Sequence, residues 1–267
     1  MIIARKSLGQ NFLRDDNVAR NILDRLQLHH DDLLLEVGTG TGALTKHLAG
    51  KVERLLGVEI DQRAAETMRG RFGESVQVVQ GDILSISLAE ITARFGKKVR
   101  VVGNIPYYIT SEILFWIYDQ RDHVRDATLM MQLEVARRLT ASPRTKDYGI
   151  LSVLTQLYGS PELLFKVSRN SFYPRPNVDS AVVRLTIKDH VAAHNELLLR
   201  NIVRSTFGKR RKTILNGLKY MGFHEETLKT LPFDLRKRPE ELGAADFLTL
   251  SGLLEEHLHE VPKLKFD

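Results

Sequence analysis

Short, mainly apolar runs alternate with longer amphipathic stretches along the chain as far as residue 131. The runs are LLLEV (33–37), LLGVEI (55–60), VQVV (76–79), VRVVG (99–103) and ATLMM (127–131). Each has the length of a strand, and apolar residues at consecutive positions indicate a strand that is buried on both faces. Strands of this kind, separated by helices, predict a parallel sheet that is covered by helices.

Two later runs extend this pattern. LLFKV (163–167) and AVVRLTI (181–187) are joined by a proline-containing turn, and we expect an antiparallel pair that closes the edge of the sheet. After Lys188 the patterns are helical, and one predicted helical face carries Ile214, Leu215, Leu218 and Met221. The sequence therefore predicts an α/β domain over 1–190 and a small all-helical domain over 191–267.

The composition limits the classes of protein to consider. The 267 residues include no cysteine, which excludes disulfides and thiolate metal sites. No apolar run approaches the roughly 18 residues that a membrane span needs. We therefore expect a cytoplasmic protein with no metal centre and no membrane contact.

Positive charge is concentrated in segments that contain no acid. The formal net charge is +6, and neither 137–146 nor 200–219 contains Asp or Glu. Several such segments favour a nucleic-acid partner over a merely solvated surface. The candidate contacts are Arg137, Arg138, Arg144, Arg204, Lys209, Arg210, Arg211 and Lys212.

The run from Lys209 to Lys212 is expected where a helix begins, with Ser205 or Thr206 as its cap. Cations at a helix N-terminus oppose the macrodipole. A bound phosphate would explain their position.

A glycine loop follows the first predicted strand in LLLEVGTGTGALT (33–45). Gly38 and Gly40 allow the tight turn and the close approach that a nucleotide needs. Glu59 ends the next strand, where a carboxylate suits the two hydroxyls of a ribose. The loop also satisfies the G-x-G-x-x-G/A pattern, so NAD and S-adenosylmethionine are both open at this point.

Two more strands end in polar residues at the same predicted edge. Asp82 can accept a hydrogen bond from an exocyclic amine, although Asp is also a common helix cap. In NIPYY, the Asn104 side-chain oxygen and the Ile105 carbonyl, which Pro106 restricts, form a pair of acceptors. The pair matches a base –NH₂ group, and Tyr107 offers a ring on which the base can stack. An enzyme that transfers hydride does not need this arrangement, whereas an enzyme that methylates an amine does.

The chain resembles the KsgA/RsmA family of small-subunit rRNA adenine N6,N6-dimethyltransferases over almost its whole length. The matching segments are LGQNFLRD (8–15), EVGTGTG (36–42), VEID (58–61), GDIL (81–84), NIPYYITSEILF (104–115), YGILSVLTQ (148–156), FYPRPNVDSAVVRL (172–185) and FGKRRKTI (207–214). The resemblance implies a Rossmann-like, seven-stranded class I methyltransferase sheet over 1–190 and a helical rRNA-binding domain over 191–267. It also implies S-adenosylmethionine as cofactor, and 16S rRNA within the 30S subunit as partner.

The resemblance also assigns roles to individual residues. Those expected in catalysis are Asn104, Ile105, Pro106, Tyr107 and Phe172, the last as a second aromatic that closes on the flipped adenine. Those expected to bind the cofactor are Gln10, Asn11, Leu13, Glu36, Gly38, Gly40, Glu59, Ile60, Asp82, Ile83 and Asn104.

Three alternative functions are weighed from the sequence. A large-subunit rRNA adenine methylase would share the catalytic domain, but FGKRRKTI argues against it. An NAD-dependent oxidoreductase is disfavoured by NIPYY. A non-enzymatic rRNA-binding assembly factor fits the basic segments, but the intact NIPYY motif argues for activity. A monomer is expected.

Overall fold

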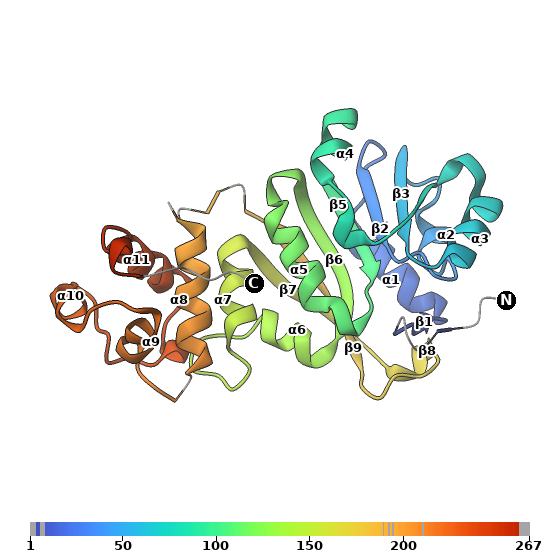
Figure 1. Ribbon diagram of the computed structural model, residues 1–267. Coiled ribbons are helices and arrows are strands. Elements are labelled where there is room, and N and C mark those ends of the chain that lie inside the picture. The colour runs from blue at the N-terminus through green and yellow to red at the C-terminus, as the bar shows by residue number, and fades with distance from the viewer. Residues whose placement is uncertain are drawn as a thin grey trace. The chain divides into compact units, whose positions relative to one another are not determined.

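Seven strands form one mixed sheet in the computed structural model, which describes residues 4–5, 9–188, 190–191, 193, 195–209 and 211–261. The strand order is β4-β3-β2-β5-β6-β9-β7, and β2 to β6 run parallel while β9 is antiparallel to β6. The strands are β2 (Leu33–Val37), β3 (Arg54–Glu59), β4 (Gln77–Gln80), β5 (Val99–Asn104), β6 (Val124–Gln132), β7 (Gly159–Val167) and β9 (Ser180–Ile187). The predicted seven-stranded sheet is confirmed (Figure 1).

Burial of the central strands on both faces explains their mainly apolar runs. Every residue of β2 is buried, and so is β5 up to Gly103. Gly103 is required where these strands meet, because a Cβ there would lie 2.6 Å from the carbonyl oxygen of Val37. The two strands can therefore pair closely only with glycine at this position.

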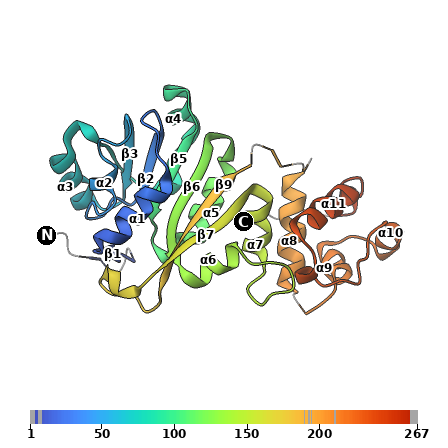
Figure 2. The ribbon, with the colours of Figure 1, turned by 180° about the vertical axis from the view of Figure 1, so that it is seen from behind.

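Helices cover both faces of the sheet. They are α1 (Asp16–Leu26), α2 (Thr45–Leu48), α3 (Gln62–Phe72), α4 (Leu88–Phe95) and α5 (Thr110–Asp119). Figures 1 and 2 show α1 and α5 on opposite faces. Asp15 caps α1 by accepting a hydrogen bond from the N–H of Asn17, and Ile22 and Leu26 pack from α1 into the core. Short 3₁₀ helices span Gly73–Ser75, Ile83–Ser85, Tyr107–Ile109, Arg121–His123, Arg169–Ser171, Pro239–Glu241 and Leu258–Glu260.

A separate two-stranded sheet joins segments that lie far apart in the sequence. In it β1 (Phe12–Leu13) pairs antiparallel with β8 (Phe172–Tyr173), with Phe12 opposite Tyr173 and Leu13 opposite Phe172. Leu13 and Phe172 are buried in the core that includes α1. The pairing brings the N-terminal segment against the FYPRP turn.

The helical part of the chain forms a second compact unit, consisting of Arg137–Gly159 and His190–Asp267. Its helices are α7 (Ile150–Tyr158), α8 (Glu196–Gly208), α9 (Ile214–Met221), α10 (Glu225–Thr230) and α11 (Ala244–Glu255), and α6 (Leu133–Leu139) contributes its last turn. None of the helices in the described part of the chain combines the length and the apolar character that a membrane crossing requires.

Tyr148 shows why residues before 160 join this unit. Its ring lies 6.1 Å from that of Phe207, which in turn lies 6.0 Å from Phe247, and its hydroxyl donates to the carbonyl of Leu242 at 2.9 Å. The division at residue 190 that the sequence predicted leaves Arg137–Gly159 with the sheet, whereas the structure groups this segment with the helices. The role of each domain stays a prediction.

Candidate functional site

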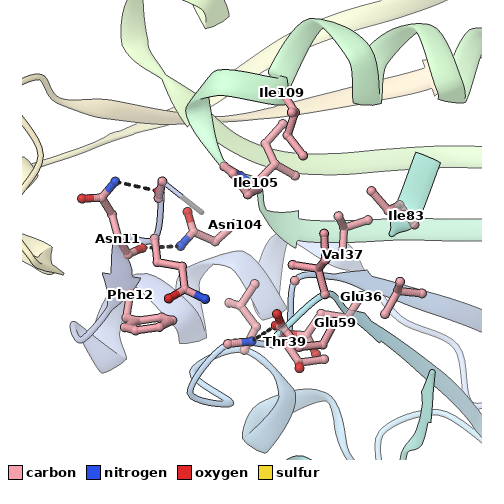
Figure 3. A pocket seen from close by; sticks show the side chains of 18 of the residues that line it. Asn11, Phe12, Glu36, Val37, Thr39, Glu59, Ile83, Asn104, Ile105 and Ile109 are labelled. Carbon is pink, nitrogen blue, oxygen red and sulfur yellow. Dashed lines mark hydrogen bonds between the residues drawn. The ribbon is translucent and has the colours of Figure 1, made fainter. Parts of the chain in front are cut away.

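A pocket of about 950 Å³, counted with its open mouth, lies at the carboxyl ends of the parallel strands (Figure 3). This is where open α/β sheets bind their ligands. Every residue predicted to bind the cofactor lines it: Gln10, Asn11, Leu13, Glu36, Gly38, Gly40, Glu59, Ile60, Asp82, Ile83 and Asn104. The structure therefore brings these residues together, and their individual roles stay predictions.

The glycine loop forms one wall of the pocket. Gly38 and Gly40 have φ of +71° and +54°, a region that side chains with a Cβ rarely adopt. The N–H of Gly38 donates to the carbonyl of Val58 at 2.9 Å, which attaches the loop to β3. A Cβ at Gly40 would lie 3.1 Å from the ring of Phe12, so glycine also permits this close packing.

Glu59 holds the loop in place from the end of β3. Its Oε2 accepts from the N–H of Gly40 at 2.8 Å (Figure 3), and its Oε1 accepts from the N–H of Asp61 at 2.9 Å. Each carboxylate oxygen has a second lone pair. The bonds to the backbone are therefore compatible with additional bonds to hydroxyl groups of a ligand.

Glu36 and Thr39 contribute buried polar atoms that the described residues do not satisfy. Glu36 is 1% exposed, and its Oε2 has no hydrogen-bond partner among the described residues, as is also the case for the Thr39 hydroxyl. Burial raises the pKa of Glu36 to about 8 and the charge of Glu59 acts in the same direction, whereas hydrogen bonding from Thr45 opposes the shift. Such atoms are rare in folded proteins, and at the wall of a pocket they indicate a polar ligand.

Asp82 caps a short helix and also lines the pocket, while its predicted bond to an exocyclic amine stays a prediction. Its Oδ1 accepts from the N–H of Leu84 at 3.0 Å and so caps the short helix Ile83–Ser85, while the residue also lines the pocket. A carboxylate has a second oxygen for an outside donor. Ile60, which is 50% exposed, and the buried Ile83 provide apolar surface next to it.

Asn104, at the end of β5, is oriented by a hydrogen bond to the N-terminal segment. Its Nδ2 donates to the carbonyl oxygen of Asn11 at 2.9 Å (Figure 3). Because the amide nitrogen is used in this bond, the amide oxygen is the group that can accept from a ligand. The predicted acceptor thus has a defined orientation at the pocket wall.

The residues after Asn104 are also held in position. Ile105 is buried, and its N–H donates to the carbonyl of Met130 at 3.2 Å. The Tyr107 hydroxyl lies 2.6 Å from the Oγ of the buried Ser180, and burial raises the pKa of Tyr107. Ile105, Pro106 and Tyr107 all line the pocket, beside Asn104.

The remaining wall comes from residues 9–13, of which the sequence analysis missed Gly9 and Phe12. Gly9 has a φ of +55°, and a Cβ there would lie 2.7 Å from the ring of Tyr108, another residue that was missed. The glycine in LGQNFL and the second aromatic of NIPYY are the signals that could have predicted this contact. The segment therefore touches both the glycine loop and NIPYY.

Phe172 is placed differently from the other predicted catalytic residues. It is 4% exposed, packs in the core and does not belong to the described residues that line the pocket. It lies opposite Leu13, which does line the pocket. Its predicted stacking on a base stays a prediction.

The candidate RNA contacts belong to the helical unit. Arg137 and Arg138 lie in the last turn of α6, Arg204 lies on α8, and Arg144 follows α6 and ion-pairs with Glu241 at 3.7 Å. Lys209, Arg211 and Lys212 are exposed, whereas Arg210 lies outside the described residues. Their contact with RNA stays a prediction.

The expected helix start at Lys209 is wrong. Ser205 and Thr206 lie inside α8, where the Thr206 hydroxyl donates to the carbonyl of Ile202 at 2.7 Å, and Lys209 is the C-cap of that helix. The next helix begins only at Ile214. Lys209 therefore lies at a helix C-terminus, where the macrodipole favours a cation, so its position does not require a bound anion.

Comparison with known proteins gives the family. The family model described as ribosomal RNA adenine dimethylase matches residues 1–255. The chain is 45% identical over 249 residues to Ribosomal RNA small subunit methyltransferase A of Chlorobium phaeobacteroides (strain BS1), covering 93% of each chain. It is 39% identical over 271 residues to the protein of the same name from Moorella thermoacetica, covering 95% of this chain and 93% of that one.

Solved structures with similar folds support the same family. A dimethyladenosine transferase from Plasmodium falciparum is 26% identical with a TM-score of 0.74, over 93% of this chain and 98% of that one. The 23S rRNA methyltransferase ErmE is 29% identical with a TM-score of 0.68, over 92% and 100%. The chain belongs to the ribosomal RNA adenine dimethylase family.

Proposed function

We propose that this protein transfers methyl groups from S-adenosylmethionine to N6 of two adjacent adenosines near the 3′ end of 16S rRNA, giving dimethyladenosines during ribosome biogenesis. It acts in the cytoplasm, as a monomer, on the small (30S) subunit. The observation that carries the proposal is the oriented amide of Asn104 beside Ile105, Pro106 and Tyr107 at the wall of the pocket. The names of the relatives give the same reaction class and the same subunit.

The pocket fits the proposed cofactor. Glu59 presents a buried carboxylate for the ribose hydroxyls, and Asp82 with Ile60 and Ile83 suits the edge and the faces of an adenine. The unsatisfied Oε2 of Glu36 and the N-terminal segment suit the polar methionine end. When bound, S-adenosylmethionine supplies an electrophilic methyl group on a sulfonium.

The residues of NIPYY prepare the nitrogen that receives the methyl group. The Asn104 amide oxygen and the Ile105 carbonyl accept the two hydrogens of the adenine –NH₂, which favours a pyramidal nitrogen whose lone pair is available. Tyr107 stacks on the base, which must leave its own stack to enter the pocket. Alignment and acceptors that stabilise developing positive charge are the main contributions.

This chemistry needs no strong general base. Once methylated, the nitrogen is acidic and loses its proton to water. For the second transfer the pocket must accept an amine with only one hydrogen left, so one of the two acceptors suffices. Basic side chains of the helical unit, such as Arg204 and Lys209, hold the rRNA backbone.

A large-subunit rRNA adenine methylase is the second candidate, because the fold of ErmE is also similar. Relatives named small subunit methyltransferase A support the first candidate, since they match at 39–45% identity along nearly the whole chain. An assembly role without catalysis is disfavoured by the intact Asn104, Pro106 and Tyr107.

The experiment is incubation with isotopically labelled S-adenosylmethionine and unmethylated small subunits, followed by digestion to nucleosides and mass spectrometry. We expect labelled N6,N6-dimethyladenosine at two neighbouring positions. Large subunits treated in the same way serve as the control. Monomethyl product alone, or label only on large-subunit RNA, would contradict the proposal.

A further inference from the structure

An exposed aromatic ring lies beside the pocket wall. Tyr173 ends β8 and is 55% exposed, and it is paired directly with Phe12, whose ring packs on the glycine loop inside the pocket. Directly opposed residues of an antiparallel pair project to the same face, with Cβ atoms about 4.5–5.5 Å apart. Tyr173 therefore continues the aromatic wall of the pocket to the surface.

Arg14 covers part of this ring. Its guanidinium carbon lies 3.9 Å from the ring centroid of Tyr173, and both side chains are exposed. The N–H of Arg14 donates to the carbonyl of Ser171 at 2.8 Å, which fixes the backbone of Arg14 next to β8. The pair therefore presents an aromatic plane and a planar cation on a rigid backbone.

The surroundings of Arg14 suit a phosphate-bearing ligand. Arg14 also lines a hollow of about 390 Å³, open mouth included, together with Lys46 and Arg71. Two acids line it as well, but Asp15 caps α1 and Asp16 forms ion pairs within the chain. Because Lys46 is ion-paired with Asp16 and Asp15 is used as the cap of α1, Arg14 and Arg71 are the cations that make this hollow complementary to an anion.

We propose that Tyr173 and Arg14 form a stacking platform for a nucleotide adjoining the target adenosine, an inference that rests on the proposed function. A base that flips into the pocket leaves its neighbour without a stacking partner. Aromatic rings and guanidinium planes stack on such bases in single-stranded RNA. Phe172, the neighbouring aromatic of the turn, is buried in the core, whereas Tyr173 is exposed.

Substitution of Tyr173 tests the platform. Tyr173→Leu keeps an apolar side chain but removes the aromatic face, so we expect KM for unmethylated small subunits to rise roughly 5- to 100-fold. Tyr173→Phe should stay within about 2-fold of the unsubstituted protein. The affinity for S-adenosylmethionine and the melting temperature should be unchanged, because the side chain is exposed.

Phe95→Leu is the matched control. Phe95 forms a similar cation–aromatic pair with Arg54, 4.8 Å from the ring centroid, at the amino end of β3 and thus at the opposite edge of the sheet. Its KM should not change. An equal rise in both Leu variants, or no rise in Tyr173→Leu, overturns the platform.

Cross-linking tests which nucleotide is bound. With Tyr173→p-benzoylphenylalanine, irradiation in complex with unmethylated small subunits should give reverse-transcription stops within a few nucleotides of the two adenosines. Stops elsewhere in the rRNA, or cross-links only to a ribosomal protein, overturn the platform while leaving the proposed function intact. If the unsubstituted protein forms no dimethyladenosine, the proposed function fails and the platform fails with it.

Discussion

Two buried acids at opposite ends of β2 have opposite electrostatic environments. Asp32 precedes the strand and is 7% exposed; Glu36 lies four positions later and is 1% exposed. Burial alone would raise the pKa of Asp32, yet bonds from the N–H of His29 and the guanidinium of Arg100 hold that pKa below its usual range. The pKa of Glu36 is raised to about 8.

The difference lies in how completely the described residues supply hydrogen-bond partners to the buried acid at each end of the sheet. At the amino end, Arg100 bonds Asp32 at 2.7 Å and Asp126 at 3.0 Å, and it also donates to the carbonyls of Leu26 and Gln27. At the carboxyl end, within the described residues, the Oε2 of Glu36 is without a partner. A buried acid whose oxygens are all bonded within the chain is structural, and a buried acid with one oxygen left unbonded marks the place for a ligand.

The largest expected effect is at the amino end. Arg100→Met would leave Asp32 and Asp126 buried without their partner, so we expect the free energy of unfolding to fall by about 3–5 kcal/mol. Urea denaturation measures it. Activity per folded molecule should be retained, because the pocket lies at the other end of the strands.

Arg125→Gln is the matched control for this prediction. Arg125 bonds the same Asp32 at 3.2 Å, but its side chain is 55% exposed. Exposed ion pairs contribute at most about 1 kcal/mol. If the two variants were destabilised equally, burial would not be the reason why the ion pairs of Arg100 stabilise the protein.

At the carboxyl end, Asn104→Ala should mainly lower turnover. Loss of one preorganised polar group costs about 100-fold or more in rate, or roughly 2.7–4 kcal/mol. Single-turnover rates with saturating cofactor and small subunits measure it, with the exposed Asn17→Ala as control. A rate near that of the unsubstituted protein would refute the role given to Asn104.

Glu59→Ala should weaken cofactor binding by about 1–3 kcal/mol, because charge-assisted hydrogen bonds to the ribose are lost. Isothermal titration calorimetry with S-adenosylmethionine measures the affinity. Glu53→Ala is a matched control, since Glu53 is exposed just before the other end of β3. If both variants bind the cofactor equally well, the site is not at the carboxyl end.

The contrast between the two ends also explains how much could be predicted from the sequence. The strands were predicted because burial on both faces leaves a mainly apolar run, as in β2. Glu59, Asp82 and Asn104 were predicted because each ends such a run or follows it within a few residues. A local sequence pattern was thus enough to predict a site residue wherever its place at the end of a strand also places it in the pocket.

Features that depend on distant partners were not predicted. The strands β1 and β8 have two residues each, too few to show a period, although their pairing joins Phe12 to Tyr173. Arg100 is a single charge within an apolar run, and its partners are far away in the sequence. Ser205 and Thr206 have the composition of helix caps, but packing continues α8 through them to Gly208.

The smallest expected effect is the contribution of Glu36 to the pH dependence of the free energy of unfolding. Its pKa is raised to about 8 when folded and is near 4.5 when unfolded, so the folded state binds more protons between these values. The free energy of unfolding therefore falls as the pH rises from about 4.5 to about 8, and it levels off above that value. Between pH 7 and 9 the unsubstituted protein should lose roughly 1–2 kcal/mol more than Glu36→Gln, which cannot ionise. Urea denaturation of both proteins without cofactor, over this range, measures the difference, and other titrating groups cancel in the comparison. Parallel curves would show that Glu36 is already ionised at pH 7, and that the carboxyl end satisfies its buried acid as fully as the amino end satisfies Asp32.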